Sequence, residues 1–332
     1  MIRGATLILM ICVVAGLFAS SALSQNSVSF TPLSWNELKP ATLAADTMHV
    51  DKAGGSPVED VDGRGLLFTG TNYLWRWNIE DGSVSRVPLP PGRTGQATPV
   101  AADKNSVVIV DHESAWVFVR SSKTWKKLDG SFDQGCSPSI AGPMPGNDSH
   151  RIYIVTDCGV YLVLTESGQL LRAVGDDFAL ARRDVPSMSV AGSGAILIPE
   201  GLDLLKVTLD GPRVRKKNLY TAKSKILGVT RVDEQTIAWT SQALIFFNKD
   251  MRRVQVVPVL GRRKIQTFAA GREFHFVLFT DGSLEVMGLV TRDKWSGRDF
   301  SGSSIIIGRS GKYVFMNSHQ KLPRVFSLVN FR

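Results

Sequence analysis

Five histidines are the first residues of this sequence to consider for chemistry, and they are scattered along the chain. No two of them have the spacing of a metal-binding motif, and the sequence contains no HExxH segment. It contains no GxSxG elbow for a nucleophilic serine, and residues 308–312 lack the spacing of a phosphate-binding loop. We therefore predict no catalytic constellation, metal site or cofactor. The histidines are His49, His112, His150, His275 and His319.

Two further patterns contain side chains that bind ions or form covalent bonds. Residues 59–63 include an Asp-Val-Asp-Gly core typical of calcium loops, but the other ligands of such a loop are absent, so a plain turn is the preferred interpretation. Cys136 and Cys158 are the only cysteines after residue 24. They are too far apart for a redox CxxC motif and have no histidine at zinc spacing, so we predict a disulfide.

Positive charge is concentrated in the second half of the sequence. The chain of 332 residues has 39 Lys and Arg against 30 Asp and Glu, a formal charge of +9. Residues 1–170 have a net charge of −3, whereas residues 171–332 have +12. Such a field favours an acidic partner, although Lys and Arg can also simply keep loops and strand edges soluble. The candidate binding residues are Arg182, Arg183, Lys223, Lys225, Arg262, Arg263, Lys264, Arg292, Lys294, Trp295 and Arg298.

The elements that must position these residues recur along the chain. Short blocks of β-branched and aromatic residues repeat at spacings of 38 to 45 residues, measured between Leu67, Val108, Tyr153, Ile196, Ile237, Phe276 and Val314. A period near 40 residues that contains several strands is typical of a propeller blade. We therefore predict an all-β fold, a seven-bladed β-propeller in a single domain over residues 25–332. A pair of β-sandwiches is the rival fold, but it does not explain a sevenfold period.

The order of strands within a repeat predicts where its loops lie. Segments of small residues, such as 97–101 and 267–270, precede each hairpin and suit the crowded innermost strand. The loop before each inner strand and the turn between the second and third strands then share one face, which we call the top face. Cys136 and Cys158 both fall on this face in the third repeat. Their disulfide would close a loop of ~22 residues and stabilise the fold by about 3 kcal/mol.

The last repeat lacks an outer strand of its own in the sequence. Residues 28–33, a Val-Ser-Phe-Thr-Pro-Leu segment, provide the best candidate to complete this blade. We therefore predict that an N-terminal strand closes the ring, and that deletion of this segment lowers stability.

Two segments resemble the repeats of known propeller families. Residues 158–162, Cys-Gly-Val-Tyr-Leu, followed by Ser167-Gly168, resemble the quinoprotein-type repeat. Ala270-Gly271, His275, Thr280-Asp281-Gly282 and Gly288 resemble the regulator-of-chromosome-condensation repeat, with one spacing a residue longer and another a residue shorter. Each resemblance covers about one blade and implies the propeller superfamily. Since both families include enzymes and binding scaffolds, neither implies an activity.

The first 24 residues indicate where the protein acts. Arg3 is followed by an apolar run over residues 5–18 and by small residues that end in Ala22-Leu23-Ser24. This pattern predicts a secretory signal peptide over residues 1–24, an uncleaved anchor being the alternative. No other segment is apolar enough to span a bilayer, so we predict no transmembrane segment in the mature chain, which would be secreted, periplasmic or in an endomembrane lumen.

Two functions of different classes fit this sequence. The preferred one is a non-catalytic scaffold that binds an acidic protein or another anionic ligand through the top face; the secretory address argues against nucleic acid. The alternative is a propeller enzyme, a hydrolase or lyase, that acts on a carbohydrate or small substrate at the central pocket.

Overall fold

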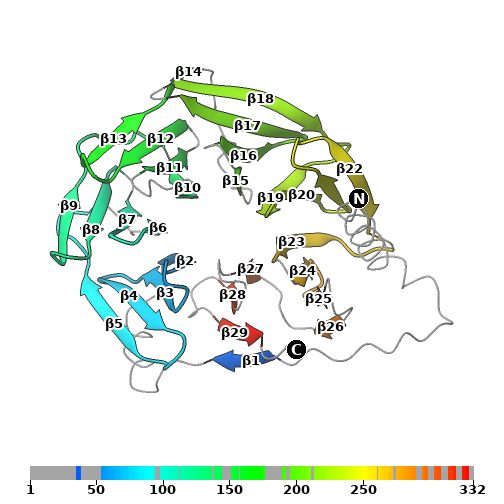
Figure 1. Cartoon of the computed structure of the whole chain (residues 1–332), viewed down its shortest axis with the longest axis horizontal. Coiled ribbons are helices and arrows are strands. Elements are labelled where there is room, and N and C mark those ends of the chain that lie inside the picture. Colours follow the sequence, from blue (N-terminus) through cyan, green and yellow to red (C-terminus); the bar gives the residue numbers. More distant parts are fainter. Residues whose placement is uncertain are drawn as a thin grey trace, which may run out of the picture.

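A ring of small antiparallel sheets forms the fold of this computed structural model (Figure 1). The described strands form seven sheets, six with four strands and one with five. The described residues contain strands and no helix. This arrangement is a β-propeller, as the repeat predicted. The structure describes residues 35–38, 54–93, 98–111, 113–136, 138–143, 151–156, 158–175, 189–191, 195–210, 213–259, 261–271, 274–288, 294–297, 303–307, 313–318 and 324–328.

The inner and second strands of each sheet lie nearest the centre of the ring (Figure 1). The inner strands are β2 (Gly54–Glu59), β6 (Thr98–Ala102), β10 (Pro138–Pro143), β15 (Ser189–Ala191), β19 (Ile226–Val232), β23 (Ile265–Ala270) and β27 (Ser303–Ile307). The second strands are β3 (Gly65–Thr69), β7 (Ser106–Val110), β11 (Arg151–Thr156), β16 (Ala195–Glu200), β20 (Gln235–Thr240), β24 (Phe274–Phe279) and β28 (Tyr313–Ser318). The small-residue segments of the sequence are therefore inner strands.

The third and outer strands complete the sheets toward the rim. The third strands are β4 (Tyr73–Asn78), β8 (Ala115–Val119), β12 (Gly159–Leu164), β17 (Asp203–Asp210), β21 (Ala243–Phe247), β25 (Leu284–Gly288) and β29 (Arg324–Leu328). The outer strands are β5 (Val84–Pro88), β9 (Thr124–Lys127), β13 (Gln169–Arg172), β18 (Arg213–Thr221), β22 (Arg253–Pro258), β26 (Lys294–Gly297) and β1 (Trp35–Leu38), and β14 (Val174–Gly175) lies outside β18. Outer strands are partly exposed, which explains their polar composition.

Apolar side chains form the core between neighbouring sheets. Every residue of β3 and β7 is buried, since both faces of these strands are covered by adjacent sheets. One cluster joins Leu67 of β3 to Ile109 of β7, and another joins Phe68 of β3 to Phe315 of β28. The second cluster connects the first complete repeat with the last. The core is therefore distributed around the ring as a series of contacts between sheets.

An N-terminal strand completes the last sheet. β1 pairs antiparallel with β29, with Trp35 opposite Leu328 and Leu38 opposite Val325. Closure by an N-terminal strand is thus confirmed, and the described strand that pairs with β29 is Trp35–Leu38; the predicted residues 28–33 lie outside the described residues. The signal-peptide prediction for residues 1–24 lies outside them too. Among the described residues, no helix is long and apolar enough to cross a membrane.

Consecutive outer strands are also linked along the rim. Asp129, just after β9, forms a parallel bridge with Gln169 of β13, with Leu170 donating its backbone N–H to the Asp129 carbonyl oxygen at 2.8 Å. Gly130 has φ of +113°, and a Cβ there would lie 2.4 Å from the Leu170 carbonyl oxygen, so the close approach requires glycine. β14 pairs in the same parallel sense with the start of β18. Each link extends one sheet onto the outer strand of the next.

Candidate functional site

Two loops place four of the candidate cations on the top face. Lys223 and Lys225 lie between β18 and β19, and Arg262 and Lys264 lie just before β23, with all four side chains exposed. The Ile226 N–H donates to the Gly201 carbonyl oxygen at 2.8 Å, and the Ile265 N–H donates to that of Ser241 at 2.8 Å. Gly201 and Ser241 belong to turns between second and third strands. The loops and these turns therefore share one face, as the strand order predicted.

Arg263 behaves differently from its two basic neighbours. Its guanidinium donates from Nη1 to Glu285 Oε1 at 2.6 Å and from Nη2 to Ser283 Oγ at 2.7 Å. The same group lies 3.5 Å from the centroid of the Phe279 ring, a cation–π contact. Glu285 is only 11% exposed in its side chain. Arg263 is thus paired within the chain, and its contacts hold the β24–β25 turn against the loop before β23.

The other candidate binding residues divide into two groups. Lys294 and Trp295 lie in the outer strand β26, which corrects the prediction that they sit in a top-face loop. Outer strands expose one side to solvent, so their polar sequence resembles that of a loop. The rest of the set lies outside the described residues: Arg182, Arg183, Arg292 and Arg298.

The disulfide lies at the top of the third repeat, as predicted. Cys136 and Cys158 are bonded, with 5.6 Å between their Cα atoms. Polar contacts surround the bond. Asp133 donates its backbone N–H to the Tyr161 hydroxyl at 3.0 Å, and its carboxylate forms an ion pair with Arg172. Burial raises the pKa of Tyr161 and outweighs the hydrogen bond from the Asp133 N–H, which acts to lower it. The disulfide and this ion pair hold the loop before β10 against the sheet.

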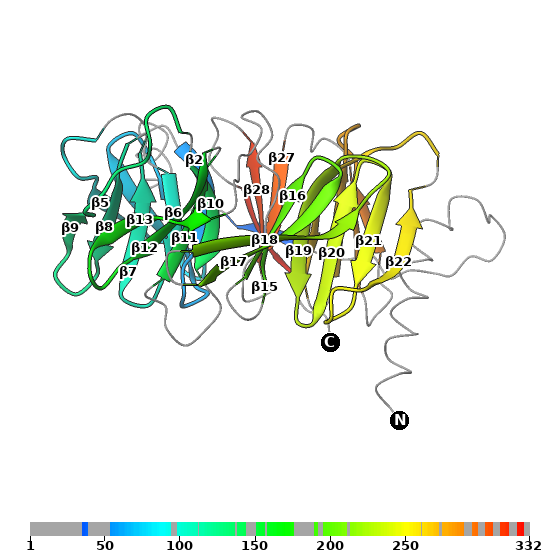
Figure 2. The same cartoon turned by 90° about the horizontal axis from the view of Figure 1, so that it is seen from above.

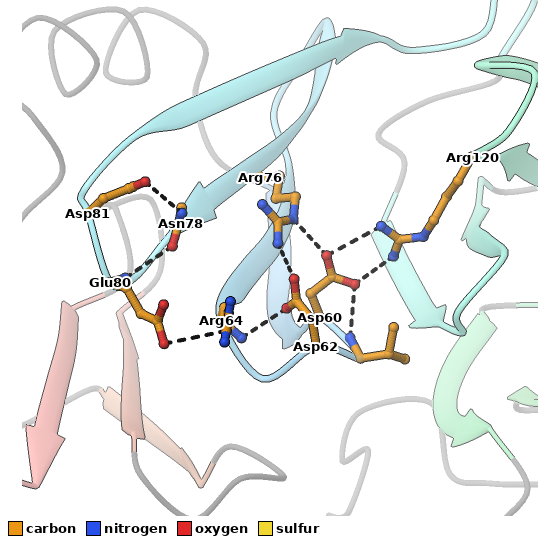
Figure 3. A network of polar contacts seen from close by, with 9 residues as sticks. Asp60, Asp62, Arg64, Arg76, Asn78, Glu80, Asp81 and Arg120 are labelled. Carbon is orange, nitrogen blue, oxygen red and sulfur yellow. Dashed lines mark hydrogen bonds and ion pairs between the residues drawn. The ribbon is translucent and has the colours of Figure 1, made fainter.

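A network of charges that the sequence did not reveal joins the first two complete repeats (Figure 3). Asp60, at 2% side-chain exposure, accepts from Arg76 Nε at 2.7 Å and from Arg120 Nη2 at 2.6 Å. Arg76 also donates to Asp62 at 2.5 Å. Burial would raise the pKa of Asp60, but the hydrogen bonds from Arg76 and Arg120 outweigh it and hold the pKa below its usual value. We call Asp60, Arg76 and Arg120 the inter-blade clamp.

This clamp also settles the interpretation of residues 59–63. Both aspartates of the Asp-Val-Asp-Gly core bind arginine, and Oδ1 of each also accepts a backbone N–H group, from Val61 at Asp60 and from Arg64 at Asp62. The segment is therefore a turn between β2 and β3, as preferred from the sequence. Among the described residues, no group of three His, Cys, Asp or Glu side chains could hold a metal ion.

His275 is a buried strand residue. It lies in β24 with 2% exposure, and its ring packs edge-on against Phe268 with 5.4 Å between centroids. Burial lowers its pKa to about 4. Its Nδ1 atom has no hydrogen-bond partner in the described structure. This histidine therefore stays neutral in the folded protein near pH 7. His112 and His319 lie outside the described residues.

Comparison with known proteins supports the fold and names no family. No protein-family model matches the sequence, and no curated protein matches it. The solved structure "YCF48 bound to D1 peptide" matches with a TM-score of 0.66 at 13% identity over 93% of this chain and 99% of that chain. "Structure of U3-55K" matches with a TM-score of 0.62 at 12% identity over 90% and 100%. PorZ, described as a surface component of the type-IX secretion system of Porphyromonas gingivalis, matches with 0.56 at 10% identity over 89% of this chain and 38% of that one.

Proposed function

We propose that this protein is a non-catalytic propeller scaffold that binds an acidic segment of a protein partner through the basic loops of its top face. The observation that carries the proposal is the exposure of Lys223, Lys225, Arg262 and Lys264 on two neighbouring loops of one face. Backbone hydrogen bonds to the adjacent sheets hold both loops in place. A fixed array of cations attracts an acidic partner and loses little conformational freedom when it binds.

The structural similarity to a propeller with a bound peptide supports a binding role. Arg182, Arg183, Arg292 and Arg298 remain candidates from the sequence alone, whereas Arg263 acts in this proposal by holding the loop that presents Arg262 and Lys264. The signal-peptide pattern supports an encounter in a secreted, periplasmic or lumenal compartment.

Charge reversal with a matched control tests this proposal. Arg262→Glu with Lys264→Glu removes the cations of the loop before β23, and Lys104→Glu with Lys249→Glu makes the same charge change in exposed turns of the opposite face. Each mature protein is used for affinity capture from its own compartment at several salt concentrations. We expect the wild type and the control to capture the same acidic protein, with binding that weakens as salt rises, and the Arg262/Lys264 variant to lose it. Equal capture by both variants would refute the proposal.

A further inference from the structure

An exposed leucine lies beside the basic loops of the top face. Leu202, in the turn between β16 and β17, has 46% exposure, the highest of the large apolar residues in the part of the chain that the structure describes. When the ring is seen from its edge, the turns and loops form two opposite faces (Figure 2). Turns between second and third strands belong to the top face. This face therefore presents an apolar side chain as well as cations.

The matching position in two other repeats is polar. In each case the residue lies just before the third strand, and its carbonyl oxygen accepts the backbone N–H of the residue just after the outer strand. Because this contact uses only the backbone, asparagine and glutamine form it as well as leucine does. The fold therefore does not require the leucine side chain. The three bonds join Leu89 N–H to Asn72 O at 2.8 Å, Ala222 N–H to Leu202 O at 2.8 Å, and Val259 N–H to Gln242 O at 2.7 Å.

Two lysines follow the backbone contact that Leu202 makes. Ala222, whose N–H donates to the Leu202 carbonyl oxygen, directly precedes Lys223, and Lys225 lies two residues further along. Both lysine side chains are exposed. The hydrogen bond fixes the start of their loop beside the turn, so the apolar side chain and the cations are presented together.

The acidic residues of the same turn are less accessible than these lysines. Asp203 is half-buried, and its carboxylate accepts hydrogen bonds from the Asn218 side chain at 2.9 Å and from the Thr221 hydroxyl. These contacts direct the carboxylate toward β18. Glu200, before the turn, is also half-buried. A ligand that approaches the top face here therefore meets Leu202 and the lysines first.

An exposed apolar side chain next to cations fits a ligand in which an apolar side chain lies next to carboxylates. A single exposed leucine is common on protein surfaces, but here the matching turns are polar and the adjacent loop is basic. Charge attracts any acidic segment, whereas removal of apolar area from water distinguishes segments of equal charge. We infer, on the basis of the proposed function, that Leu202 contacts an apolar side chain of the acidic partner segment and so selects it from segments with only acidic and polar residues.

The test compares two labelled peptides of equal charge, with glutamates on both sides of a central leucine or asparagine. We expect the full-length wild-type protein to bind the leucine peptide about fivefold more tightly than the asparagine peptide. The Leu202→Asn variant should bind the two equally, and its backbone should be preserved because Asn72 occupies the matching position. The matched control, Val61→Asn, removes a side chain of 39% exposure from a turn of the opposite face and should bind as the wild type does.

The outcomes separate Leu202 from the proposed function. If the wild type binds both peptides equally, and Arg262→Glu with Lys264→Glu loses both, the top face binds acidic segments but Leu202 selects none of them, and the inference is wrong. If the wild type binds neither peptide, the proposed function fails with it. A preference for leucine that persists in Leu202→Asn would assign the contact to another residue and also overturn the inference. So would self-association of the wild type that Leu202→Asn abolishes, since Leu202 would then contact a second copy of this chain.

Discussion

The inter-blade clamp and the rim of β18 use charged side chains in opposite ways. At the clamp, one carboxylate with 2% exposure binds two arginines from two sheets. On β18, four cations are exposed in the nine residues of one strand, with no acidic residue among them. A buried, paired charge is costly to disrupt, whereas exposed charges contribute little to stability and act on what approaches. Charged side chains therefore stabilise the ring in one region and remain exposed at its surface in the other.

Removal of the clamp carboxylate should have the largest effect. Asp60→Ala leaves Arg76 and Arg120 facing each other at the boundary of two sheets without the group that compensates their charge. We expect the free energy of unfolding to fall by about 3 kcal/mol, measured by urea denaturation followed by tryptophan fluorescence. A loss below ~1 kcal/mol would mean that solvent compensates the arginines and that the two regions differ little.

Acidification should affect the free energy of unfolding differently through the buried His275 and through the buried, ion-paired Asp60. Burial lowers the pKa of His275 to about 4, against a value near 6.5 in an unfolded chain. Between these values only the unfolded state takes up the proton, so stability is complete above about pH 6.5 and falls as the pH approaches about 4, by on the order of 3 kcal/mol.

The control for this pH dependence is the His275→Phe variant, whose free energy of unfolding should change little over the same pH range. The pKa of Asp60 is lowered instead, so its contribution is present above the ordinary carboxyl value of ~3.9 and decreases only below it. Denaturation midpoints measured between about pH 7 and 4 check both. If the stability of the variant depends on pH as steeply as that of the wild type, groups other than His275 cause the loss.

Neutralisation of the rim cations should have the smallest effect on stability. Arg215→Gln with Lys217→Gln removes two exposed charges that take part in no ion pair between described residues. We expect the free energy of unfolding to change by less than about 0.5 kcal/mol, with relief of the repulsion between Lys206 and Lys217 as a small gain. A clear destabilisation in the same denaturation assay would show that the rim, like the clamp, serves the fold.

Local patterns in the sequence predicted the ring well, because each repeat forms from neighbouring hairpins. The period, the inner strands and the disulfide all follow from spacings within one blade. The sequence predicted the closing strand at residues 28–33, whereas the described strand that pairs with β29 is residues 35–38. Its partner β29 lies almost 300 residues away, so the apolar pattern alone favoured the earlier segment. The placement of Lys294 and Trp295 in a loop was wrong because β26 is short and lies at the rim.

The polar contacts could not be predicted for a related reason. Asp60 and Arg120 are 60 residues apart, and Arg263 and Glu285 are 22 apart. No local spacing distinguishes such pairs from exposed charges, because they meet only when the sheets pack. Arg263 was for this reason grouped with Arg262 and Lys264, although its guanidinium is bound within the chain.

The pairing of β1 with β29 also bears on how the protein is made. A ribosome releases Trp35–Leu38 well before Arg324–Leu328, yet both belong to one sheet. The six other sheets, whose consecutive strands lie close in sequence, can form while synthesis continues. The edge of β1 must meanwhile remain without its partner. A chaperone that protects this edge during synthesis would thus act on the step that turns an open arc of sheets into a ring.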